Sequence, residues 1–270
     1  MKLELRNAAF SYEKGKPLLE NISLTAYSGE AWAILGKNGI GKTTLLRCLL
    51  GFRRWTSGGL YLDGKPADPA SAGGRRFWRR AAYVPQAGRQ AFPCTVEENV
   101  LLGRGAYLGL FGQPGRRDIE AAEKAMAMAG VLGIRGKNCG EISGGQLQMT
   151  LIARALASEP ELLIMDEPET GLDFRNQLMV LGLIRKLAHE RNLLVIFNTH
   201  YPEHALDTAD RTLLFLENGR ALSGPTEEVL TGENMRAAFG VEVVRAEAEY
   251  RGKTLVSLIP AGFREEGENG

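Results

Sequence analysis

The sequence has little that would point to a disulfide-linked, secreted or membrane-spanning protein. Its 3 cysteines, Cys48, Cys94 and Cys139, are odd in number and show no CxxC spacing, which argues against a disulfide framework and a zinc site. The longest apolar runs, 162–165 and 193–197, are far shorter than the ~20 residues that span a bilayer. The N-terminus lacks the continuous apolar segment of a secretion signal. We therefore expect a cytoplasmic protein with plain buried thiols.

Neither sign of charge dominates the chain. It has 33 basic and 32 acidic side chains, so no overall field favours nucleic acid or an anionic membrane. Only local patches could do so: Arg53–Trp55 and residues 75–80 mix arginine with aromatics, as RNA-binding segments do. The alternative is a solvated loop whose arginine stems lie on apolar surface.

Strand and helix patterns alternate along most of the chain. Residues 1–35 form short strand-like runs, the last of which leads into a glycine-rich loop and a helix ending at Gly51. Strand patterns at 162–167 and 193–200 alternate with helix patterns, and a hairpin turn is expected at Asn218–Gly219. The order predicts an α/β fold with right-handed crossovers, a mostly parallel sheet and an antiparallel β portion near the N-terminus.

Helix signals replace strand signals between about residues 87 and 142. Thr95 and Glu98 have the spacing of a capping box, and residues 118–129 form an alanine-rich helical pattern closed by Gly130. This stretch predicts an inserted helical subdomain. The last residues, 264–270, have a composition typical of disorder.

A complete phosphate-binding pattern lies between a predicted strand and a predicted helix. Its residues are Gly36, Lys37, Asn38, Gly39, Ile40, Gly41, Lys42 and Thr43. Glycines let backbone N–H groups curl around phosphates at a helix N-terminus. Lys42 would place its charge on the β- and γ-phosphate oxygens, and the Thr43 hydroxyl would bind Mg²⁺. The pattern predicts an ATP-type site; the alternative is a glycine-rich turn.

Two carboxylates end the apolar run that begins at residue 162. In α/β sheets, ligand chemistry lies at the carboxyl ends of the strands. Asp166 would orient the Mg²⁺ shell, and Glu167 would polarise a water against the γ-phosphate as general base. An acidic turn before Pro168 is the alternative, and the phosphate-binding loop in the same chain makes it the weaker one.

A third segment, Ile142–Gln146, fits a simple capping box through Ser143 and Gln146. Capping does not explain Gly144 and Gly145 in the first turn, where each glycine costs about 1 kcal/mol relative to alanine. Bare backbone amides at a helix N-terminus suit an anion, and that anion need not be bound by the same chain.

Together these segments, with Asn198–His200, resemble the ATP-binding subunits of ABC transporters over nearly the whole chain. The resemblance implies a head-to-tail dimer holding two ATP molecules. Each ATP would lie between the phosphate-binding loop of one copy, extended by Thr44, and the Ile142–Gln146 segment of the other copy. The residues that would act in trans are Ser143, Gly144, Gly145, Gln146 and Asp173.

The resemblance also assigns roles to other residues. Tyr12 matches the aromatic that stacks on adenine, and Gln86 matches the residue that senses Mg²⁺ and the attacking water. His200 matches the histidine that touches the γ-phosphate and holds that water. A metal site of His200 with His204 is disfavoured, because Pro202 interrupts the segment and no third ligand is apparent.

Three positions depart from the family pattern. Met149 stands where a basic residue commonly follows the Ile142–Gln146 segment, Glu169 replaces a common threonine, and Tyr201 replaces the aspartate that often follows the histidine. None removes a phosphate ligand or the base. They bear on the rate and on coupling.

The expected organisation is a single ABC ATPase domain over residues 1–270. Residues 1–86 and 153–240 would form the nucleotide-binding core, 87–152 the helical subdomain, and 241–270 a short β-like extension and tail.

Residues 92–104 and 230–243 are similar to importers of iron chelates, haem and cobalamin. The implied partners are a second copy, a membrane permease and, indirectly, an external binding protein, with the chain on the cytoplasmic face of the membrane and no nucleic acid bound. Residues 87–115 would line the groove that receives the permease. The alternatives are a soluble ABC ATPase acting on RNA or the ribosome, the ATPase of an exporter, and a scaffold that binds ATP without turnover. The presence of Glu167 and His200 argues against the last.

Overall fold

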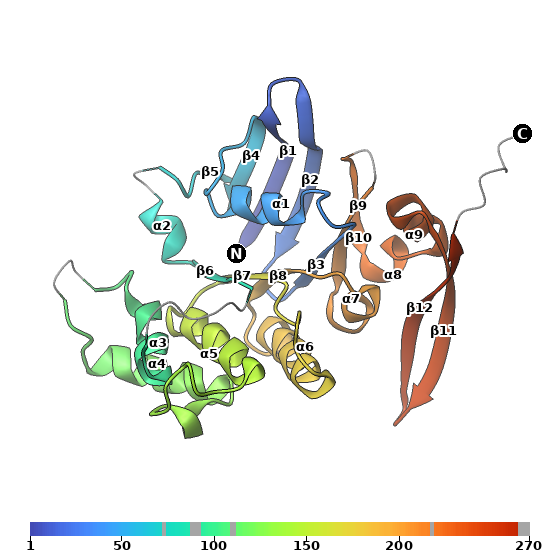
Figure 1. Cartoon of the computed structure of the whole chain (residues 1–270). Helices are drawn as coiled ribbons and strands as arrows, with labels where there is room; N and C mark the ends of the chain where they lie inside the picture. Colours follow the sequence, from blue (N-terminus) through green and yellow to red (C-terminus); the bar gives the residue numbers. More distant parts are fainter. Residues whose placement is uncertain (72–73, 87–92, 109–111, 217–218, 264–270) are drawn as a thin grey trace, which may run out of the picture.

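The computed structural model describes residues 1–71, 74–86, 93–108, 112–216 and 219–263. The described chain forms three sheets, of which the two larger ones build the core and the third is a C-terminal hairpin described below; the two core sheets differ in size (Figure 1). The smaller is antiparallel, in the order β2-β1-β4-β5, and consists of β1 (Lys2–Glu13), β2 (Lys16–Tyr27), β4 (Ser57–Leu62) and β5 (Lys65–Ala67). The larger has the order β10-β9-β3-β8-β7-β6. Its strands are β3 (Ala31–Leu35), β6 (Ala81–Val84), β7 (Leu162–Asp166), β8 (Leu194–Asn198), β9 (Arg211–Phe215) and β10 (Ala221–Pro225).

The larger sheet is parallel except for β10, which pairs antiparallel with β9. Its central strands are buried on both faces, which explains why they read as continuous apolar runs. In β3, Trp32 and Ile34 face a core shared with the antiparallel sheet and helix α1 (Lys42–Leu49), whereas Ala33 and Leu35 face the helical side. The predicted α/β fold with an N-terminal antiparallel portion is confirmed.

Helices follow β6 in the chain, as predicted. They are α3 (Val96–Leu101), η1 (Leu102–Arg104), α4 (Arg116–Met128), η2 (Leu132–Ile134) and α5 (Gly144–Ala157). The short helix α2 (Arg75–Trp78) lies before β6. Thr95 caps α3, and Glu98 closes the capping box, as expected from their spacing. Helix α5 continues across residues 152 and 153, where the core was expected to resume.

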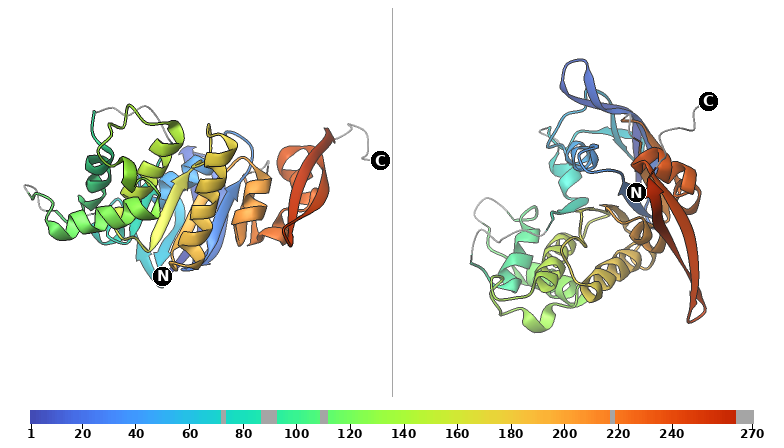
Figure 2. Two further views of the ribbon diagram at one scale, coloured as in Figure 1. Left: turned by 90° about the horizontal axis from the view of Figure 1, so that it is seen from below. Right: turned by 45° about the vertical axis from the view of Figure 1, so that its right-hand side comes forward.

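The remaining elements lie toward the other end of the molecule. They are α6 (Phe174–His189), α7 (Pro202–Thr208), α8 (Thr226–Val229), α9 (Gly232–Phe239) and the hairpin β11 (Val241–Tyr250) and β12 (Lys253–Phe263). Figure 2 shows this hairpin and the α3–α5 helices at opposite ends. The β9–β10 hairpin is formed, although Asn218 in its expected turn and the expected disordered tail, 264–270, lie outside the described residues.

The structure also bears on the cysteines and on the apolar runs of the sequence. The three cysteines are free thiols; Cys48 and Cys139 are buried and Cys94 is partly buried. No helix within the described ranges combines the length and apolar character that crossing a membrane requires.

Candidate functional site

The carboxyl ends of neighbouring parallel strands bring most of the predicted site residues together. Strands β3, β8, β7 and β6 are adjacent, and Asp166 at the end of β7 pairs with Asn198 at the end of β8. The glycine-rich loop follows β3, Gln86 follows β6, Glu167 follows β7 and His200 follows β8. Residues far apart in the sequence therefore meet at one edge of the sheet.

The glycine-rich loop wraps around the amino group of Lys42. Lys42 Nζ donates hydrogen bonds to the carbonyls of Gly36 (2.6 Å) and Lys37 (3.1 Å). Gly41 precedes α1 with φ 119°, and no side chain caps the helix, so its first N–H groups suit an anion. Burial lowers the pKa of Lys42 from its ordinary value, against the opposing effect of Glu167 and Asp166. The loop is thus built to hold phosphate against a buried cation.

Asp166 is nearly buried and is held from two sides. Asn198 Nδ2 donates to its Oδ1 (2.7 Å), and the Tyr83 hydroxyl donates to its Oδ2 (3.3 Å). Burial, together with Asp166, raises the pKa of Tyr83 to about 12, so this hydroxyl remains a donor at neutral pH. The carboxylate is fixed but keeps lone pairs for a further ligand.

Glu167 adopts an unusual backbone conformation with φ 48°. Its N–H group donates to Asn198 Oδ1 (2.6 Å), which holds the backbone in this left-handed region. Gln86 Nε2 donates to Glu167 Oε2 at 3.2 Å. The predicted base and the predicted water sensor are therefore in contact.

His200 lies between the base and the lysine. Its Nε2 is 2.5 Å from Glu167 Oε1, and its Nδ1 is 3.2 Å from Lys42 Nζ. These contacts fit an imidazole that accepts from Lys42 at Nδ1 and donates to Glu167 at Nε2. One histidine thus connects the phosphate-binding loop to the predicted general base.

Tyr12 lies beside the start of α1. Its hydroxyl is 3.2 Å from Thr44 Oγ1, its ring meets Phe10 edge-on, and Arg53 lies over it at 5.7 Å. Tyr12 as a whole is 56% exposed, so it is accessible to a stacking ligand.

A groove of about 830 Å³ opens beside the phosphate-binding loop. Gly36, Lys37 and Asn38 form one side of it, together with His200. Apolar residues of α9, β11 and β12 form its outer wall, so the C-terminal hairpin borders the site, which its sequence did not indicate.

The residues predicted to act in trans form a second group. Ser143 caps α5: its Oγ accepts from Gln146 N–H (3.2 Å), and its own N–H donates to Gln146 Oε1 (3.1 Å). Asp173 caps α6 by accepting from the Asn176 N–H (2.8 Å). Among the described residues, the hydrogen bonds of Ser143, Gln146 and Asp173 do not reach the phosphate-binding loop.

Packing explains one of the two glycines in this segment. A Cβ on Gly145 would lie 2.2 Å from the Asn176 side chain of α6, so any larger residue there would displace that side chain. A Cβ on Gly144 would meet no atom within 4 Å. Gly144 is exposed, and packing therefore does not explain the glycine at this position.

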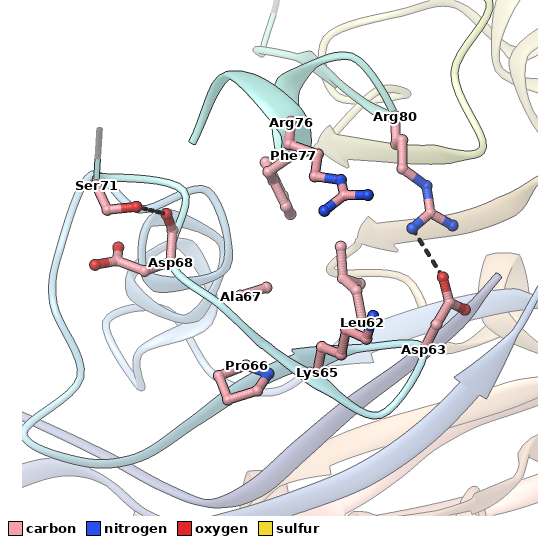
Figure 3. Close-up of a pocket in the computed structure, with 10 residues that line it drawn as sticks. All are labelled: Leu62, Asp63, Lys65, Pro66, Ala67, Asp68, Ser71, Arg76, Phe77 and Arg80. Atoms are coloured by element: carbon pink, nitrogen blue, oxygen red, sulfur yellow. Dashed lines mark hydrogen bonds and ion pairs between the residues drawn. The ribbon is translucent and has the colours of Figure 1, made fainter. Parts of the chain in front are cut away.

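A separate cavity of about 470 Å³ lies between the β4–β5 hairpin and α2 (Figure 3). Arg80 there contacts Asp63 (2.8 Å) and, outside the cavity, Glu161 (2.7 Å). Phe77 is buried, and Trp78 stacks on Phe52. Several residues of the 75–80 run are thus engaged within the chain, which weakens the case for RNA binding.

The donor set at the strand ends fits Mg²⁺. Asp166 offers a carboxylate, Thr43 a hydroxyl and Gln86 an amide oxygen, which are the hard oxygen ligands that this ion prefers. Thr43 is partly buried in the first turn of α1.

Sequence reasoning missed two residues that hold the acids, Asn198 and Tyr83. Asn198 stood in the segment used for the resemblance, but its polar side chain at the end of an apolar strand was the only available signal. Tyr83 gave no signal beyond its place three residues before Gln86.

The chain is similar in sequence and in fold to known ATP-binding proteins of transporters. The family profile described as ABC transporter matches residues 19–170. The molybdate import ATP-binding protein MolC of Haemophilus influenzae is 32% identical, with 96% of each chain covered. A chain from an inward-facing structure assigned to the metal-chelate type of ABC transporter has a TM-score of 0.85 and 32% identity, with 96% of each covered. A dimeric ATP-binding cassette bound to ADP and phosphate has a TM-score of 0.69 and 26% identity, covering 83% of this chain and 98% of that one.

Proposed function

The chain belongs to the ABC transporter family as an ATP-binding subunit with ATPase activity, and from this premise we propose that it powers the import of a metal-containing solute. The observation that carries its role in ATP hydrolysis is the convergence of Lys42, Glu167 and His200 at one edge of the sheet, and the similarity to metal and metal-chelate transporters supports the cargo class. That arrangement provides a phosphate anchor, a base and a link between them.

In the proposed mechanism, Lys42 and the N-terminal amides of α1 bind the β- and γ-phosphates. Tyr12 stacks on the adenine. Gln86 and His200 orient the attacking water. Glu167 accepts a proton from this water while the water oxygen forms a bond to the γ-phosphorus. Mg²⁺, held by Thr43, Gln86 and Asp166, would neutralise charge on the phosphates. The bond to the ADP oxygen breaks, and phosphate leaves.

We further propose that two copies form the complete site. Ser143 and Asp173 support this, because they cap the N-termini of α5 and α6 and make no hydrogen bond to the phosphate-binding loop of their own chain within the described residues. A helix N-terminus suits an anion, which a second copy could provide. The dimeric relative adds support. In this dimer, Ser143–Gln146 and Asp173 of one copy would contact the ATP bound to the other.

The proposed membrane partner is a permease, with the chain on its cytoplasmic side. Within the predicted permease groove, 87–115, residues 87–92 and 109–111 lie outside the described part. In the remainder, Leu102 is 67% exposed and Tyr107 is partly exposed, whereas Arg104 is buried against Asp118 and Ala157. We propose that Leu102 and Tyr107 contact the permease, and we expect no nucleic acid partner.

For the cargo, an iron chelate, haem or a cobalamin-like metal complex is the finer proposal. The metal-chelate relative supports it, and the molybdate relative makes a metal oxyanion the competing cargo. The chain itself would not touch the cargo, which other subunits would bind.

The test is purification from detergent-solubilised native membranes, followed by ATP-driven uptake in vesicles rebuilt with the copurified permease. We expect a polytopic permease to copurify and an iron chelate to accumulate inside. Copurification of RNA or ribosomes would refute transport, export would refute import, and uptake of molybdate alone would refute the finer cargo.

A further inference from the structure

Glu169, one of the departures from the family pattern, is a fully buried carboxylate (0% exposed) close to the proposed site. It follows Glu167 by two residues, beyond Pro168. Its Oε1 accepts a hydrogen bond from the hydroxyl of Thr199, which is also fully buried. Its Oε2 has no hydrogen-bond partner among the described residues.

Thr199 directly precedes His200, and its hydroxyl makes two contacts. It donates to Glu169, and it accepts from the N–H group of Tyr201 at 3.1 Å. The backbone on both sides of His200 is therefore tied to one oxygen, and that oxygen is tied to Glu169. Thr199 N–H also donates to the Ile34 carbonyl (3.1 Å), which joins this loop to the end of β3.

A second contact reinforces this link. His204 Nδ1 lies 3.5 Å from Glu169 Oε1, and the His204 ring packs on Tyr201 with centroids 4.7 Å apart. Within the described part of the chain, His204 is the one histidine, lysine or arginine whose side-chain nitrogen lies within 4.0 Å of the Glu169 carboxylate. Glu169 thus contacts Thr199 directly and Tyr201 through His204.

Stability alone does not account for a carboxylate here. A buried carboxylate with an unpartnered oxygen costs free energy, and neutral replacements of buried charged groups are often neutral or stabilising. The loop after β7 carries Glu167 and Glu169, and the loop after β8 carries Thr199 and His200. The Glu169–Thr199 bond therefore joins the loop of the base to the loop of the histidine.

We propose that Glu169 is a positioning residue for ATP hydrolysis: through Thr199 it fixes His200 against Glu167. The proposal rests on the roles assigned to those two residues in the proposed function. Glu169 itself touches neither nucleotide nor water.

The substitution that tests it is Glu169→Thr, which restores the residue common in the family. We expect kcat to fall by about tenfold or more, because small displacements of a catalytic group have large effects on rate. Binding of a fluorescent ATP analogue should change by less than about twofold, because the phosphate-binding loop is untouched, and Tm should stay the same or rise. Glu169→Gln keeps an acceptor for Thr199 and should retain kcat within about threefold.

The coupling to Thr199 has its own test. Thr199→Val removes the hydrogen bond to Glu169 and also the acceptor for the Tyr201 N–H, so it should lower kcat at least as much as Glu169→Thr does. The double variant should be no slower than Thr199→Val alone, because the Glu169–Thr199 bond is already lost there. Thr212→Val is the matched control. Thr212 is a fully buried threonine whose hydroxyl lies 3.0 Å from Thr226 Oγ1, so its loss should lower Tm without changing kcat.

A readout independent of activity comes from the histidines. The chain has only 3, so their ring signals in an NMR spectrum of histidine-labelled protein can be assigned by single substitutions. We expect Glu169→Thr to shift the His200 signals and Thr212→Val to leave them in place.

A kcat of Glu169→Thr within about twofold of wild type would overturn the proposal, whatever the spectrum shows. So would a loss of kcat in Glu169→Gln equal to that in Glu169→Thr, or unmoved His200 signals with a lowered Tm. Absence of turnover in the wild-type protein assembled with its permease would instead count against the proposed function.

Discussion

Asn198 offers a sharp perturbation of the site, because one amide side chain holds both acids. It is fully buried, donates to Asp166 Oδ1 at 2.7 Å and accepts from the Glu167 N–H at 2.6 Å. Asn198→Asp keeps the shape and the acceptor but replaces the donor with an oxygen that faces the Asp166 carboxylate. The substitution therefore reverses one contact and leaves the other.

The size of the effect follows from that contact. A hydrogen bond to a charged group contributes about 1.5–3 kcal/mol, which corresponds to roughly 10- to 150-fold at ~1.4 kcal/mol per factor of ten. Two carboxylates in contact repel each other when both are ionised, so the pair takes up a proton more readily as the pH falls than an isolated carboxylate does. We expect kcat near neutral pH to fall within this range and more Mg²⁺ to be required. Activity should recover partly as the pH falls, because a protonated carboxyl again donates to Asp166.

The assay is steady-state ATP hydrolysis across pH and Mg²⁺ concentration. Asn21→Asp is the control, since it makes the same chemical change at an exposed position. A kcat within about twofold of wild type near neutral pH, with unchanged Mg²⁺ dependence, would refute the reasoning that Asn198 orients the acids.

Three further predictions address the base, the shared site and a surface ion pair. Glu167→Gln should lower turnover by about 100-fold while ATP still binds, and near-normal hydrolysis would contradict the general-base role. A chain with Ser143→Arg and one with Lys42→Ala should each be inactive alone but hydrolyse ATP when mixed, since one composite site keeps both halves; inactivity of the mixture would contradict a shared site. The hydrogen bond from Arg80 lowers the pKa of Glu161, so its stabilising effect is present at neutral pH and is lost as the pH falls below about 4. Arg80→Gln should therefore lower Tm at neutral pH, and this difference should shrink on acidification; a constant difference would exclude the ion pair as its cause.

The sequence predicted what depends on local pattern. The phosphate-binding loop is a contiguous stretch whose glycines and lysine act together, and the capping boxes at Thr95 and Ser143 join residues three positions apart. The apolar runs identified the buried strands because burial on both faces removes polar residues from them. These features need no knowledge of which strands are neighbours.

The rest required the strand order. Asn198 holds Asp166 because β8 lies beside β7, and no local pattern shows which strands pair. Likewise, Gly145 makes room for the Asn176 side chain of another helix, whereas the sequence indicated only that two glycines were costly. Glu169 could be recognised as unusual but not as buried against Thr199.

The packing of α5 against α6 bears on where an anion at Gly144 would come from. Gly145 lies against Asn176, whose side chain is itself fixed by Asp173 at 2.9 Å, so the N-termini of the two helices form one joined surface. Any movement of Gly144 toward the phosphate-binding loop of its own chain would have to carry or break this α5–α6 contact. An approach by a second copy leaves this packing undisturbed. This packing is consistent with the proposed association of two chains, and the mixing of the Ser143 and Lys42 variants tests that proposal.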